Sequence, residues 1–300
     1  MNRHVYIVGR GDRYMTETPK LTYNPLESDK ALKMSKSSFM LYNLCPRKYW
    51  WQYIAIPDLR PPPTPEMIRG SAIHKAMEPV IEAPKDKKKI KKADETIIKE
   101  GYEGDFGYSI MKDLLADMEE KIGKWELLQA EMKMTVYDER LDIWLVGAID
   151  GLLKTEDGKI ILVELKTGNM NESKLSRTRR ELAYYTYMLN LTGDWPMPTH
   201  FLFIAPDASN EKTLEKLMKQ KRKVVGCGLT QGMFVLEPIS LRTINAFMEV
   251  YENTVVNIKT KQWPMKWNEY FCTQYCDYIV QCEPETLGIA DDPTIEEEEE

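Results

Sequence analysis

Two charged side chains stand in an otherwise apolar run, Glu164 and Lys166 in "KIILVELKTG" (residues 159–168). Charges in a core strand are unfavourable unless they are paired, bound to a metal ion or used in chemistry. Side chains alternate along a strand, so Glu164 and Lys166 are predicted to share one face, with Leu165 on the other. The run therefore indicates either a structural ion pair or a catalytic site.

A turn signal, "TEDG" (residues 155–158), precedes this run and predicts an antiparallel hairpin that places Asp150 opposite Glu164. Two carboxylates at this separation suit a hard divalent cation such as Mg²⁺ or Mn²⁺. A lysine beside them can orient an attacking water or stabilise charge that develops on a phosphate. On these three residues alone, a buried ion pair without catalytic use remains an open alternative.

Hydrophobic patterning and turn signals predict an α/β fold with a central mixed sheet flanked by helices. Ser35 or Ser37 is the expected start of the first helix, and Pro46 is expected to begin the next. Further helices are predicted over 67–82, 107–130, 174–192 and 240–260, and strands near 125–137, 143–153, 159–167, 199–206 and 232–240.

The composition is that of a globular chain of 300 residues with a net charge of −6. No apolar run is long enough to span a membrane and no secretory signal is visible, so a cytoplasmic location is expected. We predict an N-terminal extension (1–34), one main domain (35–290) with a lysine-rich insertion at about 84–95, and a disordered acidic tail (291–300).

The motifs "GAID" (147–150) and "VELKTG" (163–168) resemble the signature of the PD-(D/E)XK nuclease superfamily, in its RecB-like branch. Two further elements occur in the order of that branch. Upstream, "RGSAIHKAME" carries Gly70 and His74 of a G-x-x-x-H element, and downstream "RRELAYYTYML" carries Glu181 and Tyr185 of a Q-x-x-x-Y helix. The resemblance implies a restriction-endonuclease-like fold.

The resemblance also implies roles for these residues. A metal ion would be held by His74, Asp150, Glu164 and the backbone carbonyl of Leu165, and Lys166 would position a water for attack on a phosphodiester. Glu181 and Tyr185 lie one helical turn apart and are expected to share a face of their helix. Glu181 departs from the usual glutamine, and an ionised carboxylate cannot donate a hydrogen bond to a phosphate.

The cysteines near the C-terminus have a compact spacing, C-x3-C-x5-C, that suits thiolate ligation of one centre. "CPRKYW" around Cys45 resembles a motif of the iron–sulfur subset of RecB-like nucleases, which includes AddB-type nucleases and CRISPR-associated exonucleases. The resemblance implies a [4Fe–4S] cluster that joins the two ends of the domain; the family spacing is usually C-x2-C-x5-C. A structural zinc or unligated thiols are the alternatives. The expected ligands are Cys45, Cys272, Cys276 and Cys282.

The function expected from these patterns is a metal-dependent DNA exonuclease that acts at ends or on single strands, in recombination, replication or repair, with a phage or viral setting favoured. The alternatives are a non-catalytic iron–sulfur module that binds DNA ends and a zinc-stabilised partner-binding protein. No helicase-type phosphate loop is present, so strand separation is expected to come from a helicase or recombination partner or from a pre-existing end. Candidate phosphate contacts are Arg47, Lys48, Lys87, Lys88, Lys221 and Arg222.

Overall fold

The computed structural model describes residues 32–55, 61–82, 88, 91–93, 95, 108–167, 170–205, 224–227 and 232–286. The acidic tail and most of the N-terminal extension and of the lysine-rich insertion lie outside these residues. The chain divides into two compact units, with boundaries at Lys36/Ser37, Pro62/Pro63 and Asn253/Thr254. Within the described residues, no helix has the length and apolar character needed to cross a bilayer.

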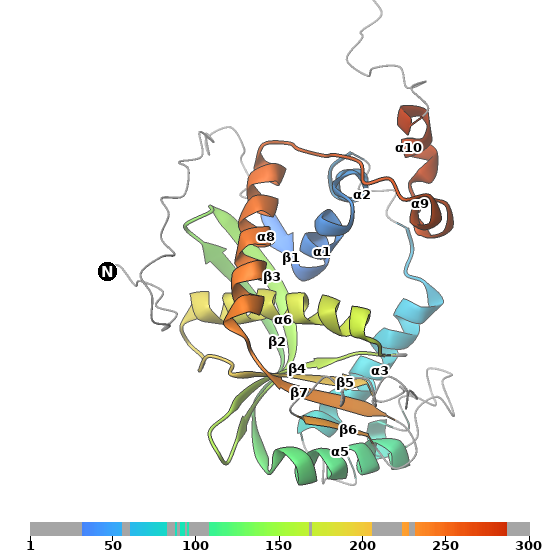
Figure 1. Cartoon of the computed structure of the whole chain (residues 1–300). Helices are drawn as coiled ribbons and strands as arrows, with labels where there is room; N and C mark the ends of the chain where they lie inside the picture. The colour runs from blue at the N-terminus through green and yellow to red at the C-terminus, as the bar shows by residue number, and fades with distance from the viewer. Residues whose placement is uncertain are drawn as a thin grey trace, which may run out of the picture. The chain divides into compact units, whose positions relative to one another are not determined.

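The first unit is built on a mixed sheet (Figure 1), as predicted, in which the described strands number seven. Their order is β1-β3-β4-β5-β7-β6, and β2 pairs with β3 outside this path. The strands β2, β3 and β4 form the predicted antiparallel meander, whereas β4 and β5 are parallel. The strand bounds are β1 Lys33–Ser35, β2 Trp125–Asp138, β3 Ile143–Thr155, β4 Ile160–Leu165, β5 His200–Ala205, β6 Val224–Cys227 and β7 Met233–Pro238.

The predicted helices that fall on described residues are present, with one clear correction, and α9 and α10 were not predicted. The helix predicted over 107–130 is α5, which ends at Ile122 because Gly123 adopts a positive φ of 86° that stops the helix and Trp125 begins β2. The other bounds are α1 Lys36–Leu44, α2 Pro46–Trp50, the π-helix η2 Trp51–Ala55, α3 Pro65–Glu82, α6 Glu172–Thr192, α8 Leu241–Lys259, α9 Glu269–Tyr275 and α10 Ile279–Thr286.

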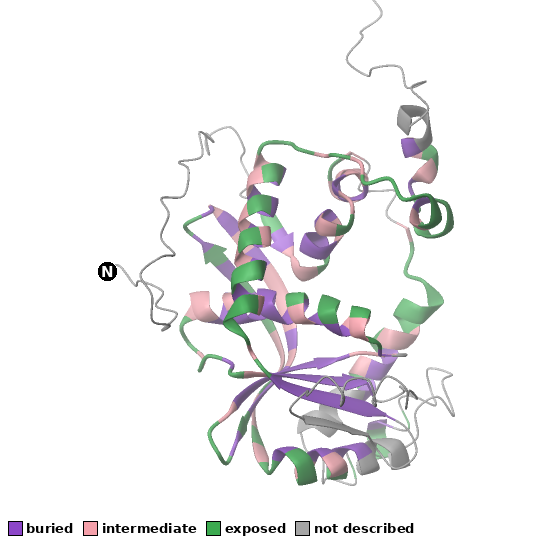
Figure 2. Ribbon diagram, in the orientation of Figure 1, coloured by how far each residue is buried: buried purple, intermediate pink, exposed green. Residues whose placement is uncertain are grey.

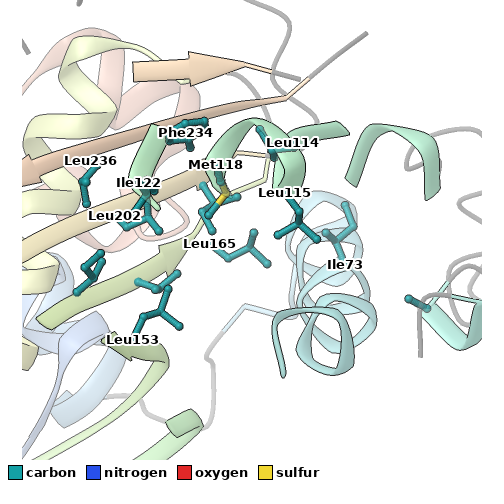
Figure 3. Close-up of a cluster of buried hydrophobic side chains, with 14 of the residues drawn as sticks. Ile73, Leu114, Leu115, Met118, Ile122, Leu153, Leu165, Leu202, Phe234 and Leu236 are labelled. Atoms are coloured by element: carbon teal, nitrogen blue, oxygen red, sulfur yellow. The ribbon is translucent and has the colours of Figure 1, made fainter. Parts of the chain in front are cut away.

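Helices cover both faces of the sheet. On one face, α3 and α5 bury apolar side chains against β3, β4, β5 and β7, with Ile73, Met118 and Leu165 in the same cluster (Figure 3). On the other face lies α6, whose buried side includes Leu182 and Tyr185 (Figure 1). Every residue of β4 is buried, as the purple central strands show (Figure 2). Glu164 and Leu165 therefore face opposite helical layers, as strand alternation requires.

The second unit is formed by two distant stretches of chain. Aromatic rings from both stretches pack together: the rings of Tyr49 and Trp263 stack with centroids 5.8 Å apart, and Tyr42 meets Tyr49 edge-on at 5.4 Å. The Tyr42 hydroxyl also donates to the backbone carbonyl of Gln262 at 2.7 Å. Residues near Cys45 are thereby held beside residues near the three C-terminal cysteines.

Candidate active site

The sheet topology brings the ends of two strands together over one stretch of β3. Because β2 occupies one edge of β3 along its length, β1 and β4 both pair with the other edge. β1 runs parallel to β3 as far as Val146, and β4 runs antiparallel to it as far as Gly151. The C-terminal ends of β1 and β4 therefore point toward each other across residues 147–150, where the charged side chains gather.

The predicted hairpin register is confirmed. Gly151 pairs with Val163, so one further step along the two strands places Asp150 opposite Glu164. The Asp150 Oδ2 atom accepts a hydrogen bond from the backbone N–H of Leu165 at 2.6 Å, which fixes its carboxylate at the end of β4.

Three potential metal ligands, His74, Glu131 and Asp150, have ligand atoms within 4.8 Å of one another. The His74 Nδ1 atom lies 3.7 Å from Asp150 Oδ1. Burial lowers the pKa of His74, and the positive charges of Lys166 and Lys36 lower it further. The neighbouring Glu164 and a hydrogen bond with the Leu165 backbone raise this pKa, but by less. A neutral imidazole keeps a lone pair for a metal ion. The trio is chemically suited to a divalent cation.

A cleft of about 540 Å³ opens in front of this trio and is lined by Gly70, His74 and Glu131, among others. A side chain at Gly70 would crowd the start of the loop after β4, because a Cβ atom there would lie 3.2 Å from Thr167 Oγ1. Gly70 thus permits close packing beside His74, and the cleft reaches two of the candidate ligands, His74 and Glu131.

Glu131 is a site residue that the sequence reasoning missed. On β2, Ala130 pairs with Gly151 and Met132 pairs with Ile149, so Glu131 stands opposite Asp150. Its φ of 43° is unusual for a residue other than glycine, and such strain often accompanies functional sites. A register count from the turn after Asp138, like the count from "TEDG", would have identified it.

Two carboxylates face each other in the site, Glu164 buried and Asp150 half-buried. Burial and the neighbouring Glu164 raise the pKa of Asp150 well above its usual range. Burial alone would also raise the pKa of Glu164, but Lys36 and Lys166 outweigh it and lower that pKa to about 2. The Glu164 Oε1 atom accepts from both ammonium groups, while its buried Oε2 atom has no hydrogen-bond partner. A buried carboxylate oxygen without a partner beside a second carboxylate is the environment that a bound cation would relieve.

Lys166 bridges two acids. Its Nζ atom lies 2.7 Å from Glu164 Oε1 and 2.7 Å from Glu181 Oε2. Glu181 stands where the resemblance predicts glutamine, and it accepts a hydrogen bond from Lys166. Its Oε1 atom also lies 3.3 Å from Arg177 Nε. Tyr185 is buried one turn further along α6, beside Gly147 of β3. The structure therefore brings all five predicted catalytic residues together around residues 147–150 of β3.

Lys36 also enters the site, and no sequence motif identified it. It directly follows β1, and its Nζ atom lies 2.8 Å from Glu164 Oε1, 3.4 Å from Glu181 Oε2 and 5.0 Å from the centre of the Tyr185 ring. Burial would lower the pKa of Lys36, but the neighbouring Glu164, Tyr185 and Glu181 outweigh it and raise that pKa.

The four cysteines predicted as ligands line one pocket of the second unit, together with Lys48 and Phe271. Their sulfurs do not form a group within 4.8 Å in the part of the chain that is described, so no cysteine cluster is seen at metal-binding separations. Burial raises the pKa of the Cys276 thiol, which Cys272 and Cys45 raise further. The Trp51 indole donates to Cys282 Sγ at 3.3 Å. The cluster stays a prediction.

The six residues proposed from sequence to contact phosphates differ in exposure, and three of them lie outside the described residues. Lys48 is buried and paired with Asp277 at 2.8 Å, and the Arg47 guanidinium lies 5.4 Å from the centre of a Trp50 ring. Lys88 is exposed. The remaining three, Lys87, Lys221 and Arg222, lie outside the described residues.

Comparison with known protein families gives a match over most of the chain. Residues 33–283 match the family model described as "PD-(D/E)XK nuclease superfamily". The crystal structure of SSO0001 aligns over 86% of this chain and 89% of that chain, at 13% identity and a TM-score of 0.35, which is too low to support an inference. No curated protein sequence matches the chain significantly.

Proposed function

The chain belongs to the PD-(D/E)XK nuclease superfamily, and from this membership and the site geometry we propose that it is a metal-dependent DNA exonuclease acting on linear ends or single strands. The observation that carries the proposal is the juxtaposition of three candidate ligands, His74, Glu131 and Asp150, with the ion pair of Lys166 and the buried Glu164. A lysine is thereby held beside a site suited to a divalent cation, which is the arrangement needed for phosphodiester hydrolysis.

We assign roles to the residues from their contacts. Mg²⁺ or Mn²⁺ would be held by His74, Glu131, Asp150 and the unpartnered Oε2 of Glu164, and would supply Lewis-acid activation of water and phosphate. Lys166 has three N–H donors and uses two of them on Glu164 and Glu181. Its third donor is left to orient the attacking water or to stabilise the developing charge on the phosphate.

The preference for ends is an expectation from the helix that carries Glu181 and Tyr185, which the family resemblance associates with end-processing nucleases. The cleft beside His74 and Glu131, at about 540 Å³, is large enough to admit a nucleotide unit. The expectation that nucleotides are removed from an end rests on the helix motif.

We also propose that Cys45, Cys272, Cys276 and Cys282 hold a [4Fe–4S] cluster. The support is that the four residues line one pocket although Cys45 is far from the others in sequence. A structural zinc held by the same four thiolates is the alternative, and metal analysis of anaerobically purified protein distinguishes the two.

The test is cleavage of linear DNA, labelled at its 5′ or its 3′ end, by anaerobically purified protein in Mn²⁺, Mg²⁺ and EDTA. A circular single strand serves as the substrate without ends. The proposal expects metal-dependent shortening of the linear DNA alone, with loss of activity in Asp150→Asn and Lys166→Met. DNA binding without cleavage in any metal would overturn it in favour of a non-catalytic module, and cutting of the circle would assign an endonuclease.

A further inference from the structure

Four charged side chains form a closed network at the meeting point of β1, β4 and α6. Lys36 and Lys166 each contact both Glu164 and Glu181, at distances of 2.8 and 3.4 Å for Lys36 and 2.7 and 2.7 Å for Lys166. The two carboxylates are nearly inaccessible, with side-chain exposures of 2% and 7%. The network is electrically neutral only when both lysines are counted.

Lys166 by itself could not balance this pair of acids. Its single positive charge would face two buried carboxylates, and an uncompensated buried charge is strongly destabilising. Arg177 reaches the outer oxygen of Glu181 at 3.3 Å, but its side chain is 62% exposed, so solvent weakens that ion pair. Lys36 is therefore the second charge that the pair requires.

We propose that Lys36 is a positioning residue of the active site, which neutralises the Glu164–Glu181 pair and so keeps Lys166 and the Glu164 carboxylate in their working positions. The proposal rests on the proposed nuclease function for its kinetic consequence. Its structural part, the mutual compensation of Lys36 and Glu181, is independent of the reaction.

The contacts of Lys36 indicate that it positions other residues rather than binding substrate. The Lys36 Nζ atom donates to Glu164 Oε1 at 2.8 Å and lies 3.4 Å from Glu181 Oε2, and another side of the ammonium group faces the Tyr185 ring. Lys36 is also placed rigidly, because the preceding Ser35 is paired with Val146 in the sheet. A lysine held in this way fixes Glu164 Oε1, and it leaves Oε2 as the oxygen that no protein group occupies.

The compensation of Lys36 by Glu181 can be measured as a double-mutant cycle. Lys36→Met removes the positive charge with little change in side-chain length, and Glu181→Gln removes a negative charge at constant shape. The double variant leaves Lys166 paired with Glu164 and is again neutral. Lys33→Met is the matched control, since Lys33 is an exposed lysine on β1, three residues before Lys36.

We expect Lys36→Met to lower the Tm of the metal-free protein by about 5–10 °C, and Glu181→Gln in the same chain to restore most of that loss. In the cleavage assay we expect Lys36→Met to lower kcat by about 30–100-fold with KM for DNA changed less than about threefold. The double variant should regain at least about tenfold in kcat, Lys36→Arg should retain most of the activity, and Lys33→Met should match wild type.

Additive effects of Lys36→Met and Glu181→Gln on both Tm and kcat would overturn the proposal. A rise in KM without a fall in kcat would also overturn it, because Lys36 would then bind DNA directly. If the wild-type protein cleaves no DNA, the proposed function fails, and the Tm cycle of the metal-free proteins still decides whether Lys36 compensates Glu181.

Discussion

Replacing Gly147 by alanine should displace Tyr185 and disturb the site without touching any charged residue. A Cβ atom at Gly147 would lie 2.6 Å from Tyr185 Cε1, 3.2 Å from Tyr185 Cδ1 and 3.3 Å from Met188 Sδ. Carbon atoms in contact prefer separations of about 3.5–4.0 Å, so the tyrosine ring has to move by about 1 Å. The ring cannot swing into solvent, since Tyr185 is only 3% exposed.

The size of the effect follows from this geometry. Overpacking of a well-filled core costs about 1–3 kcal/mol, which for a chain of this size corresponds to a fall in Tm of about 3–9 °C. The displaced ring is the one that Lys36 faces at 5.0 Å, and Lys36 in turn bonds Glu164. Because a misplacement of about 1 Å can cost about 100-fold in rate, we expect kcat for DNA cleavage to fall by that order.

The control lies four residues further along the same strand. A Cβ atom at Gly151 would meet Val163 at 3.5 and 3.6 Å, which is ordinary van der Waals contact. Gly147→Ala and Gly151→Ala thus change the same residue type in β3 and differ in whether Tyr185 must move. Tm by circular dichroism and kcat on end-labelled DNA are measured for both. Equal effects of the two variants, or full activity in Gly147→Ala, would refute the link from Gly147 through Tyr185 to the site.

Three further outcomes are expected. The pKa of Asp150 is raised in the folded protein, so its ionised form destabilises the metal-free fold, and the free energy of unfolding should rise as pH falls through that pKa. Because Mn²⁺ binds the ionised carboxylate, Mn²⁺ should raise Tm in thermal unfolding more at pH about 7.5 than at about 5.5. Asp138→Asn should lower the free energy of unfolding by about 2–4 kcal/mol in denaturant titrations and leave the metal site intact, because Asp138 is 1% exposed and accepts from the Tyr187 and Tyr251 hydroxyls. Cys276→Ser should remove iron from anaerobically purified protein, by metal analysis; wild-type protein with zinc and no iron would contradict the cluster assignment.

Local rules were sufficient for the central hairpin. The turn at residues 155–158 fixed the register of β3 and β4, and strand alternation then placed Asp150 and Glu164 on one face. The family motif supplied His74, Glu181 and Tyr185. In each case the signal lay within a few residues of the side chain concerned.

Lys36 and Glu131 were missed for different physical reasons. Lys36 reaches the site through β1, a strand of three residues that pairs with a part of β3 more than 100 residues away, and so short a strand has no readable periodicity. Glu131 can be placed opposite Asp150 only by counting the β2–β3 register from the turn after Asp138, because no residue preference predicts its φ of 43°. The predicted helix ran past the true end of α5 because only two residues separate α5, which ends at Ile122, from β2, which begins at Trp125, so the hydrophobic pattern changes from helical to strand spacing over a very short stretch.

Calorimetric titration of the metal-free protein with Mn²⁺ tests the central claim most directly, because it measures the metal site without requiring the correct DNA substrate. The wild-type protein is compared with Glu131→Gln and Asp150→Asn, which keep the shape of each side chain and remove one negative charge, and with Asp142→Asn, a change outside the trio. We expect saturable binding that Glu131→Gln and Asp150→Asn each weaken by at least about tenfold and that Asp142→Asn leaves unchanged. Binding of equal strength in all four proteins, or no binding at all, would contradict a metal centre built on His74, Glu131 and Asp150.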